Sequence, residues 1–521
     1  MFFKLLKVFL KENFGARRLF GGRVANSKGK IFLFVFLFAY GFISIGFSSA
    51  MAFYTLGLKR ELLLYIGSYA TGLGFLFALF QANGFLFHFK DYEVVGPLPI
   101  KPIVLLMAKL TTMMVFIYVI TTALCLPLVI VYYMFVPFNI IGFIYLLFGY
   151  LVFPLPAIIL GSFLSLLIAR ISKHFAKANL IQTILMFAVF IAIFLVSMLG
   201  SVSEEQGSLI PVAIMQEISR FYPPEEWLAS AVYDQNHLHF LYLFLSHVGF
   251  FTIFLFVLAK LSVKTNQNRT SGKQAIIKSN KRKKMPVFLA LLKKEWRRFT
   301  GTPIYIFNCG FGLLMMAVMA VAAFIFKSEL MAVLGPFGPF ALLIAYAFCL
   351  ITVYTPAINL SLEGNNFALL KTLPIKGETI ISAKMMFNLV LEIPVVIVTF
   401  PFAVLATELD LWTALSSFLA VISFAVFTSI FFAWLNLFFP RFDFKTEAEI
   451  VKQSMSAFIA VFSGMGFLIL EGAIVYVLLF IPVQSLALPI ALLAIVNALL
   501  ALALYLPLRK KADVKLQRME V

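Results

Sequence analysis

The chain is poor in charged residues and in cysteine. Charged residues make up 12% of its 521 residues, whereas hydrophobic residues make up 62%; a typical soluble domain has about 25% charged residues. This excludes a soluble globular protein, because a fold of this length has too little interior to cover so much apolar surface. The three cysteines, Cys125, Cys309 and Cys349, lie far apart in or at the edge of apolar segments. That placement favours packing residues over a disulfide or metal framework.

Acidic residues are scarce as well, with 23 Asp and Glu against 42 Lys and Arg and a net charge of +19. The basic residues cluster in alternate loops, as the positive-inside rule expects of cytoplasmic segments. We therefore expect no nucleic-acid partner. The histidines His237, His239 and His247 have no nearby cysteine or carboxylate cluster, and an i, i+2 pair points to different faces of a helix. No metal site is predicted.

The chain also lacks a Gly-x-x-x-x-Gly-Lys-Ser/Thr loop, the phosphate-binding signature of many ATPases. It is therefore not expected to hydrolyse ATP. The acidic residues of 201–238 have no recognisable catalytic frame, so paired-carboxylate hydrolysis is not expected either. The chain is predicted not to be an enzyme and to bind no cofactor of its own.

What the chain has in abundance is long apolar stretches. A helix needs roughly twenty apolar residues to cross a bilayer, and about twelve segments reach that length. The expected fold is an all-α polytopic membrane protein with about twelve transmembrane helices in two six-helix repeats. The expected spans are 31–54, 61–80, 103–135, 140–169, 179–200 and 239–260 in the first half, and 303–326, 338–360, 380–406, 412–439, 453–481 and 485–507 in the second.

Loop charges predict the orientation and the domains. The basic N-terminus, central linker and C-terminal tail fall on one side, which places both termini in the cytoplasm of a cell-membrane protein. Segment 201–238, with six acidic residues and one arginine, falls outside, and its acidic side chains are expected to face water. Lys59 and Arg60 are an exception to the rule, because they are basic residues in a predicted outer turn. The adjacent Glu61 partly offsets their charge. The predicted domains are a first half (1–260), a basic linker with an amphipathic helix (261–302) and a second half (303–521).

One short motif occurs twice. Leu98-Pro99-Ile100-Lys101 is followed by Ala108-Lys109, and 275 positions later Leu373-Pro374-Ile375-Lys376 is followed by Ala383-Lys384. Both copies lie between the second and third apolar stretches of their own half. A match in sequence, spacing and place indicates two similar membrane halves fused in one chain, an arrangement common among transporters.

A short amphipathic stretch precedes each copy, in 81–102 and in 361–379. Proline fixes φ and disfavours helix in the residue before it, so each motif ends one element before the next span begins. An ordinary interfacial helix with a snorkelling lysine is the simpler alternative. The repeat favours a shared mechanical role for these residues: Phe87, Phe89, Glu93, Pro99 and Lys101 in the first copy, and Glu363, Phe367, Pro374 and Lys376 in the second.

The chain resembles a permease of the ATP-binding-cassette (ABC) transporters, in the type-two (ABC-2-like) exporter superfamily. Leu98–Lys101 and Leu373–Lys376, each with its Ala-Lys pair, carry the resemblance, which covers essentially the whole chain. Such permeases have six spans per half, an amphipathic helix before the first span and a cytoplasmic coupling helix between the second and third. One departure is the outer loop between the last two spans, which is long in the first half and nearly absent in the second.

The resemblance implies an ATP-driven exporter subunit that moves a hydrophobic or amphipathic substrate, such as a peptide or lipid-like molecule. Its partners would be the lipid bilayer, the transported substrate and two nucleotide-binding ATPase subunits, which use ATP and Mg²⁺. Two alternatives stay open. An ion-coupled secondary transporter would explain the repeat but not the repeated inner loops. A polytopic transferase acting on lipid carriers would need a cluster of catalytic groups that the sequence does not contain.

Polar residues within apolar spans are candidates for the translocation pathway. Glu392 lies near the middle of the ninth span with Asn388 beside it, and Glu471 lies in the outer part of the eleventh. A charge at mid-bilayer costs at least roughly 2.5 kcal/mol, so these groups are expected to face protein or water. Substrate contact and a hydrogen bond to a neighbouring helix are equally compatible with this placement.

Overall fold

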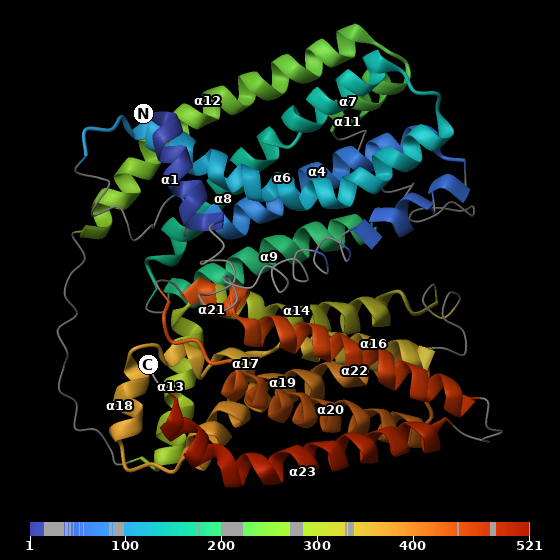
Figure 1. Ribbon diagram of the computed structural model, residues 1–521. Helices are drawn as coiled ribbons and strands as arrows, with labels where there is room; N and C mark the ends of the chain where they lie inside the picture. Colours follow the sequence, from blue (N-terminus) through green and yellow to red (C-terminus); the bar gives the residue numbers. More distant parts are fainter. Residues whose placement is uncertain are drawn as a thin grey trace. The chain divides into compact units, whose positions relative to one another are not determined.

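The computed structural model describes residues 1–14, most of 43–82, 98–175, 178–199, 222–270, 285–328, 338–444, 447–479 and 486–519, with a few isolated positions between them (Figure 1). Every regular element in these residues is a helix. The prediction of an all-helical fold is therefore confirmed for the described part of the chain.

The described residues hold ten helical segments that are long and apolar enough to cross a membrane. The chain is thus a multi-pass membrane protein. Of the other two predicted spans, 31–54 is described only in part, and 179–200 corresponds to α9 (Ala178–Leu199), an apolar helix whose described side chains run from Ala178 to Ile193. The ten segments are Lys59–Ala82, Pro102–Phe135, Ile140–Ser172, His237–Leu261, Pro303–Ile325, Phe340–Ile358, Gly377–Thr407, Leu411–Phe438, Glu449–Ile474 and Ala487–Arg518.

Two compact units make up the chain, one that runs to Lys278 and one that runs from Ser279 to Val521. In the first unit, α4 (Lys59–Ala82) packs along α8 (Leu155–Ser172) and α6 (Pro102–Phe135). Gly161 of α8 lies so close to α4 that a Cβ atom there would be 2.5 Å from the carbonyl oxygen of Phe75. Small residues let membrane helices approach closely, so van der Waals contact can hold them together where lipid removes the hydrophobic driving force.

The remaining helices of the first unit surround this pair. The amphipathic α1 packs against α6. α7 and α8 form one apolar segment that is broken at Pro154, the residue before α8, and α11 packs on α4, α7 and α12. Their bounds are α1 (Phe2–Phe14), α7 (Ile140–Val152), α11 (Pro224–Tyr233) and α12 (His237–Thr270).

The second unit is built around α20 (Leu411–Phe438), which packs on α16, α17, α19, α22 and α23. Its apolar core is rich in phenylalanine, including Phe367, Phe424 and Phe427. Figure 1 shows two short helices, α13 and α18, at one end of this bundle, across the direction of its long helices. The bounds are α13 (Val287–Gly301), α14 (Pro303–Ile325), α16 (Gly338–Ile351), α17 (Thr355–Ile358), η3 (Ser361–Glu363), α18 (Asn366–Thr372), α19 (Gly377–Thr407), α21 (Glu447–Gln453), α22 (Met455–Leu479) and α23 (Ala487–Arg518).

The two copies of the Leu-Pro-Ile-Lys motif have the same local structure. In each copy the lysine, Lys101 or Lys376, is the N-cap residue of the long helix that follows, α6 or α19. Leu373 has the extended conformation (ψ 141°) that a following proline favours, and it ends α18. The motif therefore separates a short helix from a long one in the second unit, as the sequence predicts.

Segment 222–238 corrects one expectation. Pro224 opens α11 as its first residue, a favoured place for proline. Glu225 does not face water, because its side chain is buried and its Oε1 accepts a 2.9 Å hydrogen bond from Ser68 of α4. Glu226 pairs with Arg60, which also lies 3.5 Å from Asp234. Arg60, a basic residue in a predicted outer turn, thus has two acidic partners that are distant in the sequence, in addition to its neighbour Glu61.

Burial raises the pKa of Glu225 to about 7, and the hydrogen bond from Ser68 only partly opposes this shift. The folded protein therefore binds an extra proton between the ordinary pKa of 4.5 and pH 7. Its free energy of unfolding should fall as the pH rises through this range. Glu225→Gln should remove this loss, which amounts to roughly 3 kcal/mol at most. Its Tm should exceed that of the wild type at pH 8 and match it near pH 4.5, in thermal unfolding followed by tryptophan fluorescence.

The control is Glu226→Gln, which changes the neighbouring, half-exposed carboxylate of the ion pair with Arg60. It should give no gain in Tm at pH 8. A gain in Glu225→Gln that is the same at both pH values would contradict the assignment.

Candidate functional site

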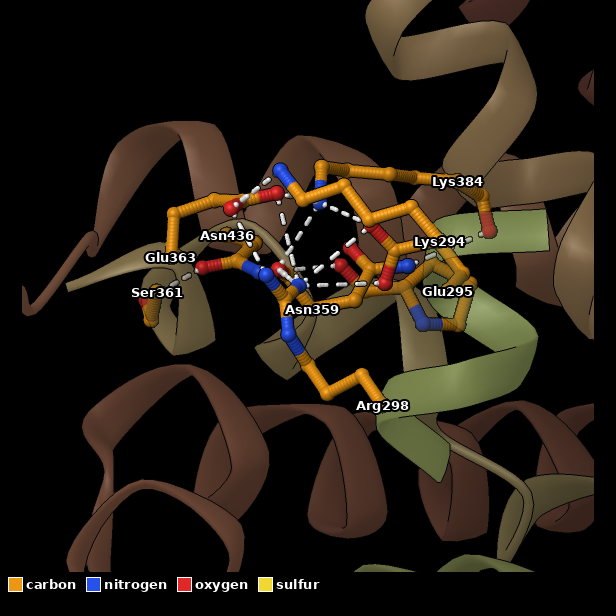
Figure 2. Close-up of polar contacts among 9 residues, drawn as sticks. Lys294, Glu295, Arg298, Asn359, Ser361, Glu363, Lys384 and Asn436 are labelled. Atoms are coloured by element: carbon orange, nitrogen blue, oxygen red, sulfur yellow. Dashed lines mark hydrogen bonds and ion pairs between the residues drawn. The ribbon is translucent and has the colours of Figure 1, made fainter. Parts of the chain in front are cut away.

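A cluster of charged side chains lies inside the second unit, where α13, η3 and the start of α19 meet (Figure 2). Lys294, Glu295 and Arg298 come from α13, Glu363 comes from η3 and Lys384 comes from α19. We call these five residues the charged network. The side chains of Glu295, Glu363 and Lys384 are at most 4% exposed, which places three formal charges in the protein interior.

Lys384 is the centre of the network. Its ammonium group donates to Glu295 Oε1 at 2.7 Å, to Glu363 Oε1 at 2.8 Å and to the carbonyl oxygen of Asn359 at 2.9 Å. A lysine ammonium has three N–H donors, so each has an acceptor. This matters because a buried charge is tolerated only when it is paired and fully hydrogen-bonded.

Arg298 joins the two carboxylates from the other side. Its Nη2 donates to Glu363 Oε2 at 2.7 Å, and its Nη1 lies 3.2 Å from Glu295 Oε2. The partly exposed Lys294 adds a third contact to Glu363, at 2.7 Å. A guanidinium presents its donors in a rigid fork, so Arg298 defines the direction of both carboxylates as well as their distance.

Helix periodicity explains why α13 can supply these groups. Glu295 and Arg298 are three positions apart and share the face of α13 that also buries Phe299. The Phe299 ring packs edge-on against Tyr305 and Phe387. An apolar contact and a charged contact therefore hold the same face of α13 against the bundle.

Hydrogen bonds fix the segment between α17 and α18. Asn359 donates from Nδ2 to the carbonyl oxygen of Lys384 at 3.1 Å. Ser361 donates to Asn436 Oδ1 at 2.6 Å, and Asn436 in turn donates to the carbonyl oxygen of Pro356 at 3.1 Å. Backbone and side chain together thus hold Glu363 where Lys384 and Arg298 can reach it.

The electrostatics of the network favour the ionised form of Glu363. Burial by itself raises the pKa of this carboxyl group, but the charges of Lys384 and Arg298 and the hydrogen bond from Arg298 outweigh it. The pKa of Glu363 is therefore held well below its usual range. Three basic and two acidic side chains leave the network with a formal charge of 3 − 2 = +1.

The network joins three segments of the second unit. Among the described residues no group of three or more His, Cys, Asp or Glu side chains could hold a metal ion. What the network does is tie three segments together: the amphipathic helix α13, the turn η3 that leads into α18, and the start of α19. Displacing one of these segments would leave buried charges without partners, which is costly.

The repeat places a second lysine in a related setting. Lys109 of α6, the counterpart of Lys384, is also buried. Its ammonium nitrogen lies 5.0 Å from the centre of the Phe9 ring of α1, a distance at which a cation and an aromatic face attract each other. In each unit, the lysine of the Ala-Lys pair is therefore buried beside the amphipathic helix of that unit.

The predicted residues of the repeated loops divide into two groups. Pro99, Lys101, Pro374 and Lys376 are exposed. Glu363 and Phe367 point inward: Glu363 is part of the charged network, and the Phe367 ring is 1% exposed and stacks on Phe442 at 4.4 Å. The Phe367 side chain therefore cannot be part of an outer apolar face that meets a partner. Among the described residues of the two loops, the exposed apolar side chains are Leu369 and Leu373 in the second loop and Leu98 in the first motif. Phe87, Phe89 and Glu93 lie outside the described residues.

The intramembrane candidates lie apart from the network. Asn388 and Glu392 of α19 are completely buried. The Oδ1 of Asn388 accepts a 2.7 Å hydrogen bond from Thr355, whereas neither carboxyl oxygen of Glu392 has a hydrogen-bond partner among the described residues. Glu471 of α22 is partly buried and lies next to Asn497 of α23.

Sequence reasoning missed Glu295 and Arg298, although one signal could have found Glu295. It is the only acidic residue in the basic segment 261–302, and Glu12 is likewise the only one in 1–30. A lone acid on an amphipathic helix, together with a lysine seven residues into an apolar span, suggests an ion pair between them. Arg298 is one of many basic residues in its segment, so its role depends on the helical face that it shares with Glu295.

Comparison of the chain with known protein families, with curated proteins and with solved structures gave no match.

Replacing Lys384 with methionine should destabilise the second unit strongly. The substitution keeps the length of the side chain but leaves the carboxylates of Glu295 and Glu363 buried without their shared cation. Removing one partner of a buried ion pair typically costs about 3–5 kcal/mol. Adding Glu295→Gln to this variant should recover part of the loss, because it removes one unpaired charge. Unfolding by sodium dodecyl sulfate in mixed micelles measures both effects.

Lys376→Met is the matched control, since Lys376 is exposed and lies one residue before α19. We expect a change below about 0.5 kcal/mol there. A similarly small change in Lys384→Met would mean that the network contributes little to holding α13 in place.

Glu392 should behave in the opposite way. Glu392 has no ion-pair partner among the described residues, so Glu392→Gln replaces a buried ionisable group by an amide of the same size without breaking an ion pair. We expect unchanged or increased stability in the same unfolding assay. The variant also separates two functions, because an ion-coupled transporter that uses Glu392 as its proton or sodium site would lose transport. An ATP-driven exporter in which Glu392 is structural would keep it.

Proposed function

We propose that this chain is the membrane-spanning permease subunit of an ATP-driven exporter of the ABC type. It would work with two nucleotide-binding ATPase subunits and move a hydrophobic or amphipathic substrate, such as a peptide or lipid-like molecule, across the cell membrane. The single observation that carries the proposal is the charged network, which joins α13, the turn before α18 and the start of α19.

In this proposal the end of the second unit that holds α13 and α18 faces the cytoplasm. The clustering of lysine and arginine in 261–302 and after Pro507 supports that orientation. Both termini would then be cytoplasmic. A soluble ATPase would reach α18 and the Leu373–Lys376 motif directly, and ATP and Mg²⁺ would be bound by that partner, because the chain has no phosphate-binding loop of its own.

The network offers a physical route from docking to movement of a span. A force on α18 acts through η3 on Glu363, whose carboxylate is held by Lys384 of α19 and by Arg298 of α13. These contacts are short, buried and multiple, so the segments should move together rather than separately. Lys384 lies in the second turn of α19, and a displacement there would tilt the whole helix.

The docking face would consist of the exposed side chains of α18 and the motif. Leu369 is 65% exposed and Leu373 is 44% exposed, although both are apolar and lie beside a charged end of the bundle. Exposed leucines at one spot suit a partner groove, where an apolar side chain gains by leaving water. The Phe367 ring, in contrast, lies on the buried side of α18, where it stacks on Phe442.

The proposal predicts that the chain purifies with an ATPase that carries the missing phosphate-binding motif, in a ratio of two ATPase copies to one permease. Leu369→Asp should weaken this association by orders of magnitude, because it would bury an unpaired charge at a cost of several kcal/mol. Pull-down of the purified ATPase, and transport per ATP hydrolysed in proteoliposomes, measure the two consequences.

Leu411→Asp is the control. Leu411 is a leucine of equal exposure, 68%, at the first residue of α20, beside the C-terminal end of α19. The Leu411→Asp variant should bind the ATPase normally. ATP-independent transport by the purified chain alone would rule the proposal out, and normal binding by Leu369→Asp would remove α18 from the docking face.

A further inference from the structure

Beyond Pro507, the C-terminal part of α23 packs against other helices of the second unit. Leu508, Ala512 and Leu516 follow one another at four-residue spacing and are all buried in the core of the unit. The ammonium group of Lys515 lies 3.4 Å from the centre of the Phe438 ring. An apolar stripe of this spacing is one face of a helix, so the end of α23 is anchored along its length.

Three polar contacts join this end of α23 to α18 and to the start of α19. Lys371 of α18 donates to the carbonyl oxygens of Gln517 and Met519 at 3.0 and 2.8 Å. Arg509 pairs with Glu378 at 2.7 Å. The third contact runs from the backbone N–H of Gly377 to the carboxylate of Asp513. Figure 1 shows the end of α23 beside α18.

The contact at Gly377 has the geometry of a helix cap supplied by a distant residue. Gly377 is the first residue of α19, where backbone N–H groups have no partner within the helix. A carboxylate there both accepts a hydrogen bond and stabilises the positive end of the helix dipole. A Cβ atom at Gly377 would lie 2.8 Å from Asp513 Oδ1 and 2.8 Å from Leu516 Cδ1, so a larger residue there would displace both side chains.

The first copy of the motif cannot accept the same cap. The residue at the position of Gly377 is Pro102, which begins α6 and has no backbone N–H to donate. The two copies share the preceding Leu-Pro-Ile-Lys residues and then differ at the position that α23 contacts.

We propose that the C-terminal end of α23 is a positioning element that fixes α18 and the Leu373–Lys376 motif, with Asp513 as its central residue. The element caps α19 after the second copy of the motif, whereas Pro102 after the first copy has no backbone N–H for such a cap. The two repeated loops are thus mechanically different, the second being braced by the end of the chain. The bracing itself does not depend on the identity of any partner. Its consequence, that ATP-driven movement enters the two halves unequally, rests on the proposed exporter function.

Hydrogen exchange of the full chain in lipid nanodiscs, followed by mass spectrometry, tests the bracing without any partner. Asp513→Ala should speed exchange in peptides that cover 366–380 by about tenfold, the effect of losing a charged cap. Asp513→Asn keeps an acceptor oxygen and should restore most of the protection. Lys511→Ala, an exposed neighbour in the same helix, should match the wild type. Peptides from α14 should be unchanged in all three variants.

Unchanged exchange over 366–380 in Asp513→Ala would overturn the proposal, as would failure of asparagine to restore protection. If Asp513→Ala speeds exchange throughout the chain, Lys371→Met tests the same brace from α18, and it must speed exchange over 366–373 alone. Absence of ATPase binding by the wild type would refute the exporter function and leave these exchange results standing. Faster exchange with unaltered transport per ATP would confine the brace to a structural role.

Discussion

A lysine buried near the start of a membrane-spanning helix imposes the constraint on which the second unit depends. The ammonium group of Lys384 cannot be left unpaired in the interior, because an uncompensated buried charge costs several kcal/mol. It is therefore surrounded by Glu295, Glu363 and the carbonyl oxygen of Asn359. Satisfying this one cation decides where α13 lies, how the chain turns between α17 and α18, and which way η3 faces.

This pairing contributes more to specificity of arrangement than to net stability, since buried ion pairs often gain little over apolar packing. The apolar contacts around Phe299 and Phe367 bring the segments together, and the charges then select one register for them. Arg298 sharpens the selection, because its planar fork reaches both carboxylates only from one direction. Segments joined in this way are held in one relative arrangement.

The two halves are similar in pattern and different in detail. Each buries the lysine of its Ala-Lys pair beside an amphipathic helix, and each begins a long helix directly after Leu-Pro-Ile-Lys. Of the two counterparts, only Gly377 can donate a backbone N–H to the carboxylate of Asp513, because the residue at its position in the first copy is Pro102. Glu392 has Ile117 as its counterpart under the same repeat. At each of these two positions, one side chain changes the contacts that are available.

The sequence by itself determined the helical class, ten of the membrane-spanning segments and the boundary at each Leu-Pro-Ile-Lys motif, since apolar length and proline act locally along the chain. Only the tertiary structure decided that Phe367 and Glu225 point inward, that Arg60 meets Glu226, and that Lys384 lies between Glu295 and Glu363. These contacts join residues from 21 to 166 positions apart, and the choice between a solvent-facing and a buried charge depends on partners that helix packing supplies.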